Sequence, residues 1–219
     1  MFYTINEENM NIKELFNSFC EDDFYSKINL HIHSNHSDGE NDFDELIEQA
    51  KNLGMKYISI TDHNTISGYK NSKYVNDEIL IQGVEFDCFY KMSLLHILGY
   101  GIDINNEKLN ALCAKNQQEQ KNDLIRLFKS RHPKKVIEAI HDAGGIAVLA
   151  HPCCCNVFNL KDFVKKLKTL GLDGIEAYYP YDRFRGIIKF SSRNKIKNIA
   201  EEYNLIKTGG SDEHKSLIK

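Results

Sequence analysis

Short apolar runs recur along the chain, and longer amphipathic segments separate them. Several runs are rich in β-branched residues and nearly continuous in hydrophobicity, which is typical of strands buried on both faces. The predicted strands cover 28–33, 57–62, 79–85, 94–99, 146–151, 174–178 and 206–211. A hairpin is predicted around 87–93, because the strands on either side of this segment are close in sequence.

Helical periodicity marks the segments between the strands. In 43–53 apolar residues share one helical face, with Asp42 and Glu45 as a capping pair and Gly54 after the last turn. Further helices with the same periodicity are predicted from Pro133 to Gly144, from Leu160 to Gly171 and from Ile196 to Tyr203. The polar stretch 107–131 is predicted as one long helix or a helix pair with a thin apolar stripe.

The alternation of strands and helices indicates the fold class. Strands separated by helices of this length form parallel βα units, so the chain is predicted to be an α/β protein. About seven such units favour a closed or nearly closed barrel. No repeat or Gly/Ser-rich linker divides the sequence. We therefore expect an N-terminal extension over 1–25 and a single barrel domain over 26–219.

Composition narrows the function classes. The formal net charge of −3 argues against capture of long nucleic acids by non-specific charge. Residues 1–15 lack the apolar core of a signal peptide, and no run is long enough to span a bilayer, so a cytoplasmic location and no membrane partner are expected. The six cysteines, including Cys153–Cys155, lack disulfide-framework spacing and are interpreted as reduced thiols.

Histidines and carboxylates gather at the ends of the predicted strands. They are His31, His33, Asp38, Asp62, His63, Glu85, His96, His151, Asp212 and His214. In barrels of this kind the chemistry lies at the carboxyl ends of the strands, so these side chains should meet at one rim. Burying so many of them together would be prohibitive without cations, and divalent metals supply that compensation. Mixed carboxylates and imidazoles suit Mn, Fe(II) or Zn and disfavour Ca.

Each of these features alone has an ordinary structural explanation. The alternating pair His31 and His33 can be structural or lie on the surface, and an Asp-His dipeptide after a strand is often a helix cap. His151 before Pro152 can simply mark the end of a strand. Their joint occurrence, in order and at successive strand ends, favours a metal site.

The ordered motifs resemble those of the PHP family, named for polymerase and histidinol phosphatase domains. They are NLHIHS (29–34), SDG (37–39), ITDH (60–63), GVE (83–85), His96, AHP (150–152) and GSDEH (210–214). The resemblance runs from about residue 28 to residue 214. It implies a PHP fold, which is a distorted (β/α)7 TIM-like barrel, with two or three Mn, Fe or Zn ions.

The resemblance also implies a ligand set for each metal. One metal would be held by His31, His33, Glu85 and Asp212. Glu85 would bridge to a second metal, held also by His96 and His151. A third metal would be held by Asp38, His63 and His214. Of these residues, Glu85, Asp212 and His214 are expected to take part in catalysis. Asp62 is expected to orient His63 or to cap the next helix, and Glu176, at the end of the sixth strand, is expected to support the site from outside the ligand set.

The function implied is hydrolysis of a phosphoester by a metal-bridging hydroxide. The expected substrate is a phosphomonoester or a short oligonucleotide, similar to a nucleoside monophosphate. A histidinol-phosphate or protein-tyrosine phosphatase is the alternative enzyme. A non-catalytic, metal-stabilised PHP module in a polymerase-type assembly is the alternative from another class, and missing ligands would favour it.

Phosphate recognition is predicted just beyond the sixth strand. Arg183 and Arg185 flank Phe184, so one guanidinium can turn inward and hold a phosphate through two parallel hydrogen bonds. Tyr179 is expected to contribute to substrate binding by stacking. The alternative is a solvated basic stretch that continues into the following helix.

Overall fold

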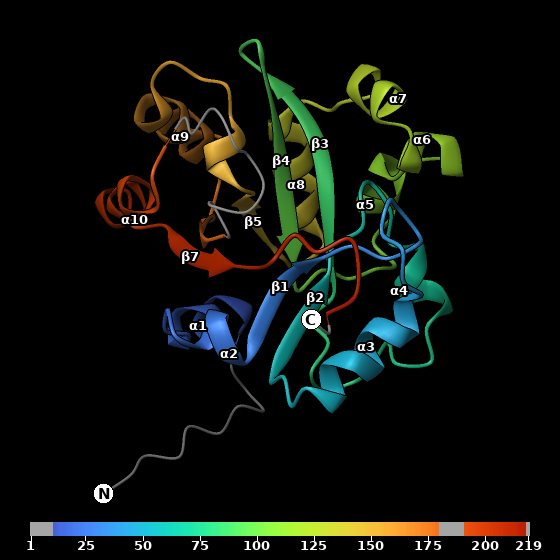
Figure 1. Cartoon of the computed structure of the whole chain (residues 1–219). Coiled ribbons are helices and arrows are strands. Elements are labelled where there is room, and N and C mark those ends of the chain that lie inside the picture. Colours follow the sequence, from blue (N-terminus) through green and yellow to red (C-terminus); the bar gives the residue numbers. More distant parts are fainter. Residues whose placement is uncertain (1–10, 180–190, 218–219) are drawn as a thin grey trace, which may run out of the picture.

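Seven strands form the centre of the computed structural model, which describes residues 11–179 and 191–217 (Figure 1). The strands are β1 (Ile28–Ile32), β2 (Tyr57–Ile60), β3 (Gly83–Tyr90), β4 (Ser93–Tyr100), β5 (Ile146–Leu149), β6 (Gly174–Tyr178) and β7 (Ile206–Gly209). Strands β3 to β7 form one sheet in sequence order, and β1 and β2 form another. The pairs β1–β2, β5–β6 and β6–β7 are parallel, whereas β3–β4 and β4–β5 are antiparallel.

Backbone hydrogen bonds join the two sheets at both edges. The N–H of His33 donates to the carbonyl of Glu213 at 2.9 Å, which ties the end of β1 to the segment after β7. On the other side, the N–H of Ile81 donates to the carbonyl of Ile58 at 2.9 Å, which ties the start of β3 to β2. The predicted distorted (β/α)7 TIM-like barrel is thereby confirmed, and the antiparallel β3–β4 hairpin is its main distortion.

Helices cover the strands on the outside (Figure 1). They are α1 (Ile12–Ser18), α2 (Asp23–Ser26), α3 (Phe43–Asn52), α4 (Ser67–Asn71), α5 (Glu107–Leu112), α6 (Gln117–Lys121), α7 (Asp123–Phe128), α8 (Pro133–Asp142), α9 (Leu160–Thr169) and α10 (Arg193–Glu202). The amphipathic helices begin as predicted, with the carboxylate of Asp42 accepting from the N–H of Asp44 and with Pro133 in the first turn of α8. Their apolar faces pack on the strands in one continuous core.

The prediction of a long helix or helix pair over 107–131 is wrong, because this segment forms three short helices. An asparagine stands before each helix: the side chains of Asn106, Asn116 and Asn122 accept hydrogen bonds from backbone N–H groups three residues further on. Each such cap starts a new helix and ends the continuity of the previous one. The broken path brings α7 towards the strand ends, where it contributes a residue to the site described below.

The third strand also differs from its prediction. It begins at Gly83 instead of residue 79, and pairing with β4 extends it to Tyr90. The hairpin turn is made by Lys91 and Met92, both with positive φ angles (49° and 63°), which match the right-handed twist of the two strands.

The N-terminal helices pack against the barrel. Phe16 of α1 is buried against Tyr100 of β4, with ring centroids 5.3 Å apart, and Lys13 pairs with Asp173 at 2.7 Å. Among residues 11–179 and 191–217, no helix is both long and apolar enough to cross a membrane.

Candidate metal centre

The end of β1 and the segment after β7 bring the first ligands together. The N–H of Asp212 donates to the carbonyl of His31 at 2.9 Å, so the two segments run side by side. Gly210 permits this approach, because a Cβ at that position would lie 2.3 Å from the Cβ of His31. Asp212 itself has a φ of 51°, and His151 after β5 has a φ of 24°. Such backbone angles cost about 1 kcal/mol or more for non-glycine residues and are concentrated at functional sites.

We call the cluster of His31, His33, Glu85 and Asp212 the first group. The Nε2 atoms of His31 and His33 both lie 3.2 Å from Oε2 of Glu85. The same two nitrogens lie 3.4 and 3.1 Å from Oδ1 of Asp212. Ligand atoms around one ion bound at about 2.0–2.2 Å would be separated by such distances.

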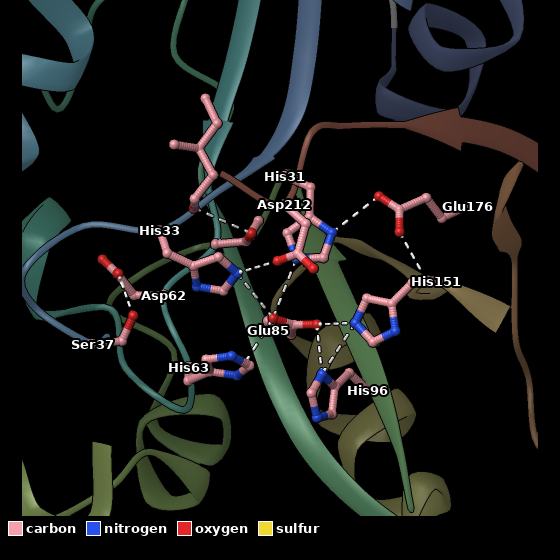
Figure 2. A network of polar contacts seen from close by, with 12 residues as sticks. His31, His33, Ser37, Asp62, His63, Glu85, His96, His151, Glu176 and Asp212 are labelled. Carbon is pink, nitrogen blue, oxygen red and sulfur yellow. Dashed lines mark hydrogen bonds and ion pairs between the residues drawn. The ribbon is translucent and has the colours of Figure 1, made fainter. Parts of the chain in front are cut away.

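Glu85 also belongs to the second group, formed with His96 and His151. Its other oxygen, Oε1, lies 2.9 Å from Nδ1 of His96 and 3.1 Å from Nε2 of His151. Figure 2 shows Glu85 between the imidazoles of the two groups, with one carboxylate oxygen directed to each. The carboxylate therefore has the position that a bridging ligand requires.

The third group consists of His33, Asp38, His63 and His214. Asp38 lies in the loop after β1, and its carboxylate oxygens lie 3.6 Å from His33 Nδ1, 3.6 Å from His63 Nε2 and 3.4 Å from His214 Nε2. His33 thus directs Nε2 to the first group and Nδ1 to the third. All nine residues that the resemblance nominated as ligands are found in these three groups.

The donor atoms of these groups are better placed to bind metal ions than to form hydrogen bonds with one another. Both ring nitrogens of His33 and Nδ1 of His63 are buried and make no hydrogen bond of acceptable geometry within the described part of the chain. They lie 3.1 to 3.6 Å from carboxylate oxygens of the three groups. Buried polar atoms left in this way are costly, and divalent cations would satisfy them.

Two buried carboxylates support the groups from outside. Oε1 of Glu176 lies 3.0 Å from Nδ1 of His31, so that ring nitrogen donates outward and Nε2 faces the first group. The outer role predicted for Glu176 is confirmed. The prediction that Asp62 orients His63 or caps the next helix is wrong. Its oxygens instead accept from Ser34 and Ser37 at 2.6 Å, which fixes the loop that carries Asp38.

Electrostatics at the centre reflect the crowding of opposite charges. Burial alone would raise the pKa of Glu85, but the imidazoles of His31, His63 and His96 outweigh it and hold that pKa well below its usual range. For His33, burial opposes protonation, yet Asp212 and Glu85 raise its pKa to about 9. Burial lowers the pKa of His63 to about 3, and the nearby charge of His33 adds to this effect.

Two residues of the centre, Asp87 and Arg126, were not predicted from the sequence. Asp87 follows Glu85 by two positions on β3, so both face the site, and its Oδ1 lies 3.1 Å from Nε2 of His96. This period-two spacing was a signal that could have revealed Asp87. Arg126 of α7 is buried, donates to both oxygens of Asp87 at 3.0 Å and reaches Asp38 at 2.9 Å. No local pattern in its polar segment indicated that position.

The predicted substrate-binding residues are only partly within the described chain. The hydroxyl of Tyr179 donates to Oδ2 of Asp212 at 2.8 Å, and the residue is buried. Arg183 and Arg185 lie outside the described residues.

The chain is similar to several known proteins. The PHP domain family matches residues 29–206. A phosphoribosyl 1,2-cyclic phosphate 1,2-diphosphodiesterase of Eggerthella lenta is 23% identical over 84% of this chain and 93% of its own length. A 5′–3′ exoribonuclease of Haemophilus influenzae is 24% identical over 86% of this chain and 90% of its own length.

Solved structures show the same fold. An amidohydrolase of Chromobacterium violaceum, solved with bound sulfate and no metal, superimposes with a TM-score of 0.71 at 20% identity. A candidate metal-dependent phosphoesterase of Bifidobacterium adolescentis gives a TM-score of 0.68 at 22% identity. Each match covers 86% of this chain and 88% of the other.

Proposed function

Because the chain belongs to the PHP domain family, we propose that it is a hydrolase, a metal-dependent phosphoesterase. The observation that carries this proposal is that the two carboxylate oxygens of Glu85 face different ligand groups. Its Oε2 lies 3.2 Å from ligand nitrogens of the first group and its Oε1 lies 2.9 Å from one of the second. A buried carboxylate shared between two converging groups is what a two-metal phosphoester centre needs.

The proposed cofactors are two to three divalent ions of Mn, Fe or Zn. Imidazole nitrogens and carboxylate oxygens in each group support these metals over Ca. When bound, the ions would supply Lewis-acid stabilisation of phosphoryl oxygens and an activated water. The complete ligand sets oppose the alternative of a non-catalytic module.

The protein's own residues would orient the metal ligands of the centre. Glu85 and Asp212 hold the imidazoles of the first group in place, and Glu176 fixes the ring of His31. His214 has the most exposed side chain of the third group, at 35%, and its Nδ1–H donates to the carbonyl of Asp212. Its Nε2 therefore faces Asp38 at 3.4 Å, where it would hold a metal of the third group.

The proposed substrate is a phosphomonoester or a short oligonucleotide. The support is that the relatives named above act on a cyclic phosphate of ribose and on RNA. Arg183 and Arg185 remain proposed phosphate ligands, and exchange of each for Lys, which keeps charge but loses the planar fork, tests that role through kcat/KM. Tyr179 is proposed to affect substrate binding through Asp212, to which it is bonded.

One experiment tests the function. Protein of known metal content is assayed against nucleoside monophosphates, histidinol phosphate, phosphotyrosine and short oligonucleotides. We expect hydrolysis of at least one of them, its loss with a chelator and its return with Mn. Metal-replete protein that hydrolyses none would overturn the proposal.

A further inference from the structure

A cleft beside the second group is not explained by metal binding. It has a volume of about 440 Å³ and lies between the β3–β4 hairpin and the segment after β5. His96 and His151 are part of its lining, so it opens directly onto two ligands of the second group. The hairpin that forms one wall projects from the body of the protein (Figure 1).

The register of the hairpin makes that wall change character along its length. Asp87 pairs with His96, and the next pair on the same face is Phe89 with Leu94. The face thus carries metal-ligand chemistry near the barrel and apolar side chains two residues, or about 7 Å, further out. Phe89 and Leu94 are 41% and 46% exposed, although the other cross-strand neighbours of this hairpin are mostly buried.

The opposite wall continues the apolar lining and ends in a polar group. Cys154 and Cys155 follow His151 and Pro152 in a 3-10 turn, and Asn156 comes directly after them. Met92 at the hairpin turn is 88% exposed and completes the outer lip. A thioether, a phenyl ring and a leucine side chain offer apolar contacts, while the amide of Asn156 offers both a donor and an acceptor.

We infer that this cleft is the leaving-group subsite of the centre and that it takes a planar heteroaromatic group, the base of a nucleoside phosphate. A phosphate at the second group would place its ester substituent between Phe89, Leu94 and the cysteine turn. The faces of a base would pack on the apolar walls, and its edge would meet Asn156. The volume suits one nucleoside and is too small for a folded partner. The inference rests on the proposed function.

The test uses metal-loaded protein and two exposed positions outside the ligand set. In Leu94→Ser and Phe89→Ser, the ratio of kcat/KM for nucleoside 5′-monophosphates over ribose 5-phosphate should fall about tenfold. Leu94→Met should retain the ratio of the parent. Leu53→Ser is the matched control, because Leu53 is 49% exposed at the end of α3, away from the cleft. An equal loss on both substrates would mean a structural effect and would overturn the subsite.

Binding measurements separate this inference from the proposed function. Calorimetry compares nucleoside monophosphate with inorganic phosphate, and Leu94→Ser should weaken only the former. If that difference is found without any turnover, the subsite stands and the phosphoesterase proposal fails. In the serine variants, kcat/KM for p-nitrophenyl phosphate relative to ribose 5-phosphate is measured as well. If this ratio falls while the ratio for nucleoside 5′-monophosphates does not, the cleft takes simple aryl groups and the base assignment is wrong. Turnover with unchanged ratios in both serine variants would overturn the subsite alone.

Discussion

The first and third groups share His33 but balance their charge in different ways. In the first group the carboxylates of Glu85 and Asp212 lie against imidazoles, and Glu176 adds a third negative group behind His31. In the third group the carboxylate of Asp38 meets imidazoles and also the guanidinium of Arg126 at 2.9 Å. Among the residues that the structure describes, no Lys or Arg pairs with Glu85 or Asp212 of the first group, whereas Arg126 gives the third group a cation built into the protein.

This difference sets an expectation for metal loading. A group that lacks a resident cation gains more from a metal, so the first and second groups should bind tightly and together through Glu85. The third group should bind more weakly, because the incoming metal shares Asp38 with Arg126. Elemental analysis should therefore find two firmly held equivalents and a third that dialysis removes.

The largest expected effect is the loss of the bridge. Glu85→Gln keeps the shape of the side chain but removes its charge from both groups. Turnover should fall about a thousandfold, and the two tight metals should be released together. Glu138→Gln is the control, because Glu138 is an exposed glutamate on α8. A variant that keeps both its metals and near-parent activity would show that Glu85 does not bridge.

The next effect is a pH dependence that should differ between the groups. Burial lowers and the neighbouring carboxylates raise the pKa of His33 and His96, each to about 9 in metal-free protein, so both are protonated at pH 7. Metals must displace these protons, and affinity for the first and second groups should rise about tenfold per proton for each pH unit between about 6 and 8. His63, whose pKa is about 3, is already neutral, and the proton on His33 leaves when the first metal binds, so binding at the third group should change less.

Calorimetry in buffers of different ionisation enthalpy measures the protons released at each step. One to two protons should leave with the first two metals at pH 7, and fewer near pH 10. Equal release at all three steps would contradict the difference between the groups. The raised pKa of His33 also affects the stability of metal-free protein. Protonated His33 and its neighbouring carboxylates stabilise the fold below about pH 6.5, and this stabilisation is lost as the pH rises through about 9.

Removal of the resident cation should make the third group more like the first. Arg126→Met leaves Asp38 and Asp87 without their guanidinium, so metal-free protein should lose about 3 kcal/mol of stability. The third metal should then bind about tenfold more tightly. Arg131→Met is the matched control: Arg131 donates to Asn64 and to a backbone carbonyl, and no ion pair joins it to the ligands in the described chain. If the affinity for the third metal is unchanged in Arg126→Met, Arg126 does not compete with that metal for Asp38.

The strand-built part of the centre was predictable from the sequence for a physical reason. Short buried runs end in His31, His33 and Glu85, and barrel geometry directs strand ends to one rim. Asp87 was within reach of the same reasoning, since it alternates with Glu85.

Arg126 could not be predicted in this way. Its position depends on where α7 begins, and that depends on the caps at Asn116 and Asn122, which divide a polar segment with no strong periodicity. Asparagine caps and turns are common, so their presence alone does not place the following helix in space. The ion pairs with Asp38 and Asp87 join residues far apart in the sequence.

The smallest expected effect concerns the support of Asp212 in the first group. The hydroxyl of Tyr179 donates to Oδ2 at 2.8 Å, which leaves Oδ1 facing His31 and His33. Tyr179→Phe removes this bond and should weaken the first metal roughly fivefold, about 1 kcal/mol, while the third is unaffected. Tyr74→Phe is the control, because its hydroxyl donates to the exposed Glu48 at the same distance of 2.8 Å. Metal titration that finds both variants equal to the parent would show that Asp212 is held without Tyr179.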